Sequence, residues 1–165
     1  MRVYLRTFGC RANQYDSERV RALVERAGGT VVDDPADADT AVFNSCAVTT
    51  EAEVELRKAV RSAARRNPRL RSVVMGCAAS LDKGELLALP SVERIVPGAD
   101  LVEVAASLGV APELSQWAVA QSGTRALLRV QDGCDEHCTF CATVLARGRN
   151  RSRAPHELVA EAMEK

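Results

Sequence analysis

Six cysteines in this sequence fall into two sets of three, and none is left over. One set is local, with the spacing C-x3-C-x2-C, and the other is spread over the first half of the chain. The local set is Cys134, Cys138 and Cys141, and the dispersed set is Cys10, Cys46 and Cys77. Thiolates are soft ligands that suit zinc and iron–sulfur clusters. A four-iron cluster held by three cysteines keeps one iron open for chemistry, so two such sites predict a redox or radical enzyme.

Each dispersed cysteine follows an apolar or β-branched run and one small residue, which is Gly9, Ser45 or Gly76. Thirty-five residues separate the first cysteine from the second, and thirty separate the second from the third. A strand–helix–strand unit takes about 30 residues or more. We therefore expect each cysteine just past the carboxyl end of a different parallel strand, at the edge where open α/β sheets bind ligands. The small residues would let the backbone approach closely there.

Two other interpretations of the dispersed set remain open. Free cysteine is among the most buried residue types, so the three are also consistent with unrelated core positions. A zinc site would need a fourth ligand, and neither histidine lies in this part of the sequence. A core cysteine usually lies within a strand, however, whereas all three here follow an expected strand end. That difference favours a shared metal cluster.

The local set has only three cysteines, whereas four-iron clusters normally use four. Its spacing also differs from the ferredoxin pattern, which begins C-x2-C-x2-C. An open iron would bind a substrate or cofactor, as the open position of a catalytic zinc does. Phe140 lies beside the last cysteine and would shield one face of the cluster. The alternative is a zinc knuckle completed by His137, which fits less well because His137 and Cys138 are adjacent.

The segments around the dispersed cysteines alternate between strand and helix, which predicts a parallel α/β sheet with flanking helices. Apolar runs predict strands at residues 2–8, 30–32, 41–45, 72–76 and 93–96. Periodicity predicts helices at 13–27, 50–66, 80–88 and 99–108, the second opened by a capping box from Thr50 to Glu53. We expect an α/β domain over 1–109, a linker over 110–124, and a second domain over 125–165 with a strand at 126–131 and a helix beginning at 155–165.

The segment RVQDGCDEHCTFC resembles the cluster-binding loop of radical S-adenosylmethionine enzymes. Together with GCRANQYDSE, FNSCAVT, VVMGCAA and RGRNRSR, it makes nearly the whole chain similar to the methylthiotransferase family. The resemblance implies an N-terminal α/β domain that binds an auxiliary 4Fe–4S cluster through the dispersed cysteines. It also implies a partial (β/α) barrel in which the local cysteines and Phe140 surround a second 4Fe–4S cluster and S-adenosylmethionine.

The resemblance further implies a reaction and its partners. Adding a methylthio group to an aromatic carbon requires breaking an unactivated C–H bond, a step that a cofactor must carry. The stretch from Cys10 to Gln14 looks most like the subgroup that modifies N6-threonylcarbamoyladenosine at position 37 of tRNA. The isopentenyladenosine and ribosomal-protein subgroups are the alternatives. The expected partners are tRNA and an electron donor such as a flavodoxin or ferredoxin, and we expect a cytoplasmic monomer.

The chain departs from the family pattern after the local cysteines. Only 24 residues follow Cys141, whereas a full barrel takes about 250. The segment ATVLARG also lacks the proline that the resemblance leads us to expect. We therefore expect the first strand, cluster loop and first helix of a truncated barrel, and no turnover by these residues alone. The alternative is an iron–sulfur or zinc module that binds RNA without catalysis.

Two basic segments are candidate contacts for nucleic acid. Arg147, Arg149, Arg151 and Arg153 alternate along the sequence, so in extended backbone their guanidinium groups would lie on one side and suit phosphates. Residues 56–71 hold seven basic residues and no acidic one, although such a helical face is equally typical of a solvated surface. The net charge is zero, so bulk charge predicts no partner. The sequence has no run of about 18 apolar residues, so no membrane span is expected.

Overall fold

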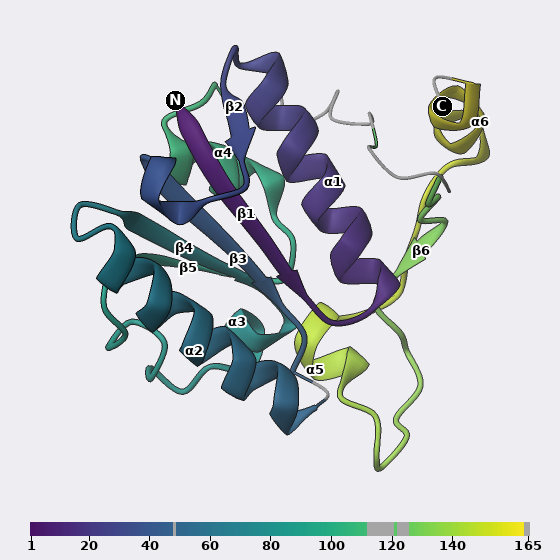
Figure 1. Ribbon diagram of the computed structural model, residues 1–165. Helices are drawn as coiled ribbons and strands as arrows, with labels where there is room; N and C mark the ends of the chain where they lie inside the picture. Colours follow the sequence, from purple (N-terminus) through teal and green to yellow (C-terminus); the bar gives the residue numbers. More distant parts are fainter. Residues whose placement is uncertain (48, 112–120, 122–125, 164–165) are drawn as a thin grey trace.

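A five-stranded parallel sheet forms the centre of the protein in the computed structural model (Figure 1). The structure describes residues 1–47, 49–111, 121 and 126–163. The strand order is β2-β1-β3-β4-β5. The strands are β1 (Arg2–Phe8), β2 (Thr30–Val32), β3 (Thr40–Ser45), β4 (Arg71–Gly76) and β5 (Val92–Pro97). Every pair of neighbours runs parallel, so the prediction of a parallel α/β domain is confirmed.

Helices cover both faces of the sheet (Figure 1). One face carries α1 (Arg11–Arg26) and α4 (Leu101–Leu108), and the other carries α2 (Thr50–Arg66), α3 (Cys77–Leu81) and the 3-10 turn η1 (Pro35–Asp37). β3 is buried along its whole length, because successive side chains point to opposite faces and both faces are covered. Phe43 packs in the apolar cluster under α2, and Val42 packs in the cluster under α1 and α4.

The capping box predicted for the second helix was wrong by one residue. Thr50 was expected to cap the helix, but the hydroxyl of Thr49 does so by accepting a hydrogen bond from the backbone N–H of Ala52 at 3.3 Å. The shift places Ala52, and not Glu53, at the position that would complete a capping box. A single threonine therefore caps the helix without the reciprocal glutamate bond.

The helix predicted at 80–88 was also wrong. The structure has α3 at Cys77–Leu81, which ends at Asp82. The carboxylate of Asp82 accepts hydrogen bonds from the N–H groups of Glu85 and Leu86 at 3.1 and 3.2 Å. The Asp82 side chain thus accepts hydrogen bonds from N–H groups that would otherwise donate within a continuing helix. Aspartate competes with helical hydrogen bonding in this way.

The C-terminal part contains short elements: β6 (Gln131–Asp132), α5 (Thr143–Arg147), β7 (Arg151–Ser152) and α6 (Pro155–Met163). A strand was predicted over 126–131, but only its last residue belongs to β6, which pairs antiparallel with the two residues of β7. A strand needs a neighbour to satisfy its backbone groups, and in the described part β7 offers only two residues. The domain boundaries and the barrel stay predictions, and most of the linker at 110–124 lies outside the described residues.

The described residues include no helix that is both long and apolar enough to cross a membrane.

The burial of β3 predicts a large difference between two substitutions. Phe43 is fully buried, whereas Val54 on α2 is 42% exposed. Phe43→Ala should lower the free energy of unfolding by about 3–5 kcal/mol, because it removes a buried ring and leaves a cavity. Val54→Ala should change it by less than about 0.5 kcal/mol. Urea unfolding followed by circular dichroism measures both, and equal losses would contradict the central position of β3.

Candidate functional site

The dispersed cysteines lie at the carboxyl ends of three adjacent strands. Cys10 comes two residues after the end of β1, Cys46 directly follows β3, and Cys77 directly follows β4 as the first residue of α3. The strand order places the switch point of the sheet between β1 and β3, where the chain winds outward in opposite directions. Ligands of open α/β sheets bind at this point. The structure thus places the three residues past the strand ends as predicted, and their role as ligands stays a prediction.

Two glycines let the three cysteine loops pack closely. Gly9 has a φ of +129°, and a Cβ built on it would lie 2.4 Å from the Cβ of Cys46. Gly76 has a φ of +93°, and its Cβ would lie 2.4 Å from Oδ1 of Asn44 and 2.7 Å from the carbonyl oxygen of Ser45. Both positions combine a backbone conformation that side chains disfavour with a lack of space for one. The loops after β1 and β4 therefore both touch the end of β3.

A buried pair of amides ties the same loops together. Asn13 of α1 and Asn44 of β3 are both completely buried. Asn13 Nδ2 donates to Asn44 Oδ1 at 2.8 Å, and Asn44 Nδ2 donates to the carbonyl oxygen of Asn13 at 2.8 Å and to Ser17 Oγ at 3.0 Å. The thiol of Cys10 donates to Asn13 Oδ1 at 3.3 Å. Buried polar groups are costly when unpaired, so this network holds Cys10 in place relative to β3. Our sequence analysis missed both asparagines as site residues.

The thiol of Cys77 shares its surroundings with the other two dispersed cysteines. Cys77 is 6% exposed. Burial raises the pKa of the Cys77 thiol, and the nearby guanidinium of Arg147 acts in the opposite direction. Cys46 and Cys10 raise the pKa further by charge repulsion. Cys46 and Cys10 are therefore near enough to Cys77 for their charges to act on its thiol.

The local cysteines lie on a loop whose base is closed by the arginine run. The N–H of Cys134 donates to the carbonyl oxygen of Gly148 at 3.1 Å. Asp135 Oδ1 accepts from the N–H of Asn150 at 3.1 Å, and β6 pairs with β7 next to it. The RGRNRSR segment is therefore the return path of the cysteine loop. In the sequence the cysteine loop and the RGRNRSR segment are separate motifs. Only the folded chain brings their backbones together.

The side chains at the tip of this loop are open to solvent. Cys138 and Cys141 are exposed, and Cys134 is half-buried. Cys141 Sγ lies 3.1 Å from Oγ1 of Thr143, and hydrogen bonds to Thr143 lower the pKa of the Cys141 thiol. A lower pKa favours the thiolate, which is the form that binds metal. Phe140 is 91% exposed, and its shielding role stays a prediction.

The four arginines of the run do not lie on one side, so that expectation was wrong. Arg147 is the last residue of α5, and the extended backbone begins only after it. Its side chain is 8% exposed, whereas those of Arg149 and Arg151 are 92% and 72% exposed. Arg153 turns inward to an ion pair with Glu161 of α6. Only Arg149 and Arg151 remain open enough to contact a nucleic acid directly.

Asp16 is the centre of a buried charge group that sequence analysis missed. Its side chain is 1% exposed, with Oδ1 2.5 Å from Arg129 Nη1 and Oδ2 2.9 Å from Arg147 Nη2. Burial raises the pKa of the Asp16 carboxyl, and the two guanidinium groups act against that rise. A signal for it was present, because Asp16 lies four residues before Val20 on the buried stripe of α1. A carboxylate in such a position requires a cationic partner.

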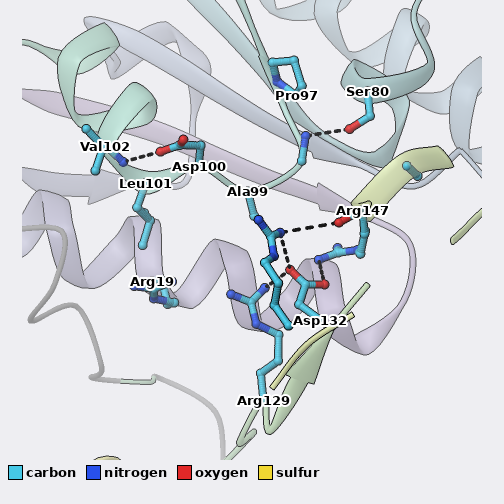
Figure 2. A pocket seen from close by; sticks show the side chains of 13 residues that line it. Arg19, Ser80, Pro97, Ala99, Asp100, Leu101, Val102, Arg129, Asp132 and Arg147 are labelled. Carbon is cyan, nitrogen blue, oxygen red and sulfur yellow. Dashed lines mark hydrogen bonds and ion pairs between the residues drawn. The ribbon is translucent and has the colours of Figure 1, made fainter. Parts of the chain in front are cut away.

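A cavity of about 480 Å³ opens beside this charge group at the carboxyl end of β5 (Figure 2). Its charged lining consists of Arg19, Arg129, Arg147, Arg151, Asp100 and Asp132. Figure 2 shows Arg129 and Arg147 converging on Asp132, at 3.4 and 3.3 Å. Asp100 is used to cap α4, because its Oδ1 accepts from the N–H of Val102 at 2.9 Å. Arg129 and Arg147 also pair with Asp16, so this wall of the cavity is a network of ion pairs.

Neither cysteine set forms a closed site for a single metal ion. Within the described ranges, no group of three or more His, Cys, Asp or Glu side chains could hold a metal ion. A tetrahedral zinc ion would need its sulfur ligands only about 3.8 Å apart, because each Zn–S bond is about 2.3 Å. An iron–sulfur cluster takes its thiolates on different irons, so its ligands are spaced more widely.

The fold and its cysteine edge define a doubly wound α/β domain with three thiols at the carboxyl edge of the sheet, two of them on either side of its switch point. Residues 2–98 match the Uncharacterized protein family UPF0004, and the chain belongs to this family.

Curated methylthiotransferases match nearly the whole chain. It is 33% identical to the tRNA-2-methylthio-N(6)-dimethylallyladenosine synthase of Rhodopirellula baltica, over 97% of this chain and 40% of that protein. It is 32% identical to the threonylcarbamoyladenosine tRNA methylthiotransferase MtaB of Thermotoga maritima, over 96% and 39%. It is 33% identical to the ribosomal protein uS12 methylthiotransferase RimO of Chlorobium phaeobacteroides, over 97% and 38%. The chain thus spans about two fifths of the length of these relatives.

The contact between Gly76 and the end of β3 predicts the effect of adding one methyl group. Gly76→Ala should lower the free energy of unfolding by about 2–6 kcal/mol, because backbone strain and overpacking each contribute about 1–3 kcal/mol. Gly28→Ala is the matched control, since Gly28 has a φ of +73° but no atom within 4 Å of the added Cβ. It should cost only the strain, about 1–2 kcal/mol. Urea unfolding compares the two, and an equal loss would mean that the loops are not in contact.

Proposed function

We propose that this protein is a radical S-adenosylmethionine methylthiotransferase that modifies N6-threonylcarbamoyladenosine at position 37 of tRNA. The observation that supports this most strongly is the meeting of three cysteine loops at the switch point of the sheet. Two of the relatives described above are named methylthiotransferases and a third is named a tRNA-2-methylthio-N(6)-dimethylallyladenosine synthase, which supports the proposal. We propose residues 1–109 as the α/β domain, 110–124 as the linker and 125–165 as the start of the radical domain.

The six cysteines act as ligands and not as nucleophiles in this proposal. Cys10, Cys46 and Cys77 would hold one 4Fe–4S cluster. Cys134, Cys138 and Cys141 would hold a second, together with S-adenosylmethionine. When bound, these groups supply the one-electron chemistry and the sulfur that no side chain provides. The contribution of the chain is to keep the two sets of thiols in place, through the buried Asn13–Asn44 pair for the first set and the β6–β7 base for the second.

Arg149 and Arg151 are the proposed contacts for tRNA phosphates. Their exposed side chains flank the base of the local cysteine loop, so RNA bound there would lie beside the proposed reaction centre. Arg149 makes a long ion pair to Asp135 at 3.6 Å, and Arg151 makes one to Asp132 at 3.8 Å and donates to the carbonyl oxygen of Arg147 at 3.5 Å. Exposed pairs of this kind contribute little, so a phosphate would displace them easily. Arg147 and Arg153 instead hold the chain together.

The choice of threonylcarbamoyladenosine depends on the stretch from Cys10 to Gln14. The relatives carry three different substrate names. Within this stretch Asn13 is buried in the amide pair, whereas Arg11 and Gln14 are exposed beside Cys10. The exposed residues are therefore the ones available to a substrate. We also propose a cytoplasmic monomer that receives electrons from a flavodoxin or ferredoxin.

Iron content tests the two proposed clusters. After anaerobic reconstitution, the chain should bind about eight irons, because each triad takes a four-iron cluster. Cys46→Ser and Cys138→Ser should each reduce this to about four. In the reduced protein, S-adenosylmethionine should change the electron paramagnetic resonance spectrum of Cys46→Ser but not that of Cys138→Ser, because only the cluster of the local set is proposed to bind S-adenosylmethionine.

Two outcomes of this experiment would count against the proposal. About four irons in the unchanged chain, with no response to S-adenosylmethionine, would indicate a binding module without radical chemistry. Bound zinc in place of iron would indicate the zinc alternatives.

Fluorescence anisotropy with labelled anticodon stem-loops tests the RNA contact. Arg149→Glu/Arg151→Glu should weaken binding by at least about tenfold at low salt, because two phosphate contacts are lost and two repulsions gained. A stem-loop with N6-threonylcarbamoyladenosine at position 37 should bind more tightly than one with isopentenyladenosine.

Arg26→Glu is the control. Arg26 is exposed at the end of α1, a helix that begins directly after Cys10 and runs away from the cysteine edge, and its substitution should leave RNA affinity unchanged. An equal loss for Arg26→Glu would show that the effect is one of bulk charge. Equal affinity for the two modified stem-loops would contradict the choice of subgroup. An absence of any RNA binding would favour a ribosomal protein as substrate.

A further inference from the structure

Arg147 connects the two cysteine sets through a single side chain. It ends α5, six residues after Cys141. α5 lies beside the ends of β1 and β3 (Figure 1) and packs against α3, whose first residue is Cys77. The guanidinium of Arg147 lies close enough to Cys77 for its charge to lower the pKa of that thiol. A residue from the loop of the local cysteines therefore reaches one of the dispersed cysteines.

The guanidinium also joins two other parts of the chain. Nη2 lies 2.9 Å from Oδ2 of Asp16 on α1, and Nη1 lies 3.3 Å from Oδ1 of Asp132 on β6. The side chains of Arg147 and Asp16 are 8% and 1% exposed. Arginine presents several donors in a rigid planar fork, so it can satisfy both carboxylates at once, which the single ammonium of lysine does poorly. A charge buried this deeply also penalises any arrangement in which its partner is absent.

Cys46 and Cys77 are both 6% exposed, but different parts of the chain bury them. Cys46 belongs to the apolar cluster under α2, together with Phe43 and Leu56. Cys77 belongs to neither of the two apolar clusters of the described residues. Its neighbours include Arg147, which α5 brings from outside the α/β domain. The docked C-terminal part therefore contributes to the cover of Cys77, whereas the apolar cluster under α2 contributes to that of Cys46.

We propose that Arg147 and Asp16 form a latch that docks the loop of the local cysteines over Cys77. Arg147 is a positioning residue in this arrangement: it sets the distance between the two cysteine sets and closes the dispersed site. For its functional consequence this inference rests on the proposed function. The docking itself involves only side chains of this chain, so it can be measured on reduced, metal-free protein. Its result does not depend on the results of the iron and RNA experiments.

The test is the rate at which N-ethylmaleimide alkylates each cysteine, followed by peptide mass spectrometry. Arg147→Met should accelerate alkylation of Cys77 by about tenfold or more, because breaking a buried ion pair favours local opening. Removing a nearby positive charge without undocking would instead slow the reaction, because fewer thiols would be ionised. The sign of the change therefore separates docking from simple electrostatics. A Cys77 rate that is unchanged or slower overturns the proposal.

Arg149→Met is the matched control, because Arg149 lies on the same segment but is 92% exposed. It should leave the Cys77 rate unchanged, and an increase equal to that of Arg147→Met overturns the specific role of Arg147. Asp16→Asn should accelerate the alkylation of Cys77 as Arg147→Met does. In the double variant Cys77 should react no faster than in either single variant, because the two residues act as one unit. Additive accelerations overturn the latch.

Cys46 reports whether the α/β domain itself stays folded. It should remain slow in every variant, because its cover comes from the apolar cluster under α2. If Arg147→Met accelerates the alkylation of Cys46 and Cys77 equally, the domain has unfolded. The variant Arg147→Lys then tests the latch in its place. Lysine keeps the charge but not the fork. Selective acceleration of Cys77 by Arg147→Lys supports the latch, and an unchanged rate overturns it.

Discussion

The parallel direction of the sheet is the constraint on which the rest of this structure depends. Because every neighbouring pair of strands runs parallel, all the carboxyl ends lie at one edge. Cysteines that are 30 or more residues apart in the sequence are thereby brought to adjacent strand ends. The order β2-β1-β3 then puts the switch point between the first two of them. An antiparallel sheet with the same sequence spacing would send alternate cysteines to opposite edges.

The close packing at this edge buries polar groups, and the chain satisfies them by pairing them with one another. The loops touch so closely that a methyl group on Gly9 or Gly76 would overlap neighbouring atoms. Asn13 and Asn44 satisfy each other where no water reaches them. Asp16 is satisfied by two arginines from the C-terminal part. These groups would be destabilising without partners, so they favour the single arrangement in which the edge is complete.

The same edge is where the C-terminal part attaches to the α/β domain. Asp16 receives Arg129 and Arg147, and the neighbouring Tyr15 hydroxyl lies 3.1 Å from the carboxylate oxygens of Glu161 on α6. Consecutive residues of α1 thus hold segments that lie more than a hundred positions away in the sequence. In a methylthiotransferase of the proposed kind, that attachment would keep the sulfur-bearing site and the radical site at a constant distance.

The sequence by itself determined the local features: the two cysteine triads, the alternation of strands and helices, and the parallel α/β class. These depend on spacing and periodicity, which are visible along the chain. Only the tertiary structure decided the strand order, the switch point, the buried roles of Asn13, Asn44 and Asp16, and the division of the arginine run into buried and exposed members. Arginines that alternate in sequence look equivalent, but the partner of each is set by which distant carboxylate the fold brings within reach. A buried charge is stabilised by such a partner, and sequence distance carries no information about it.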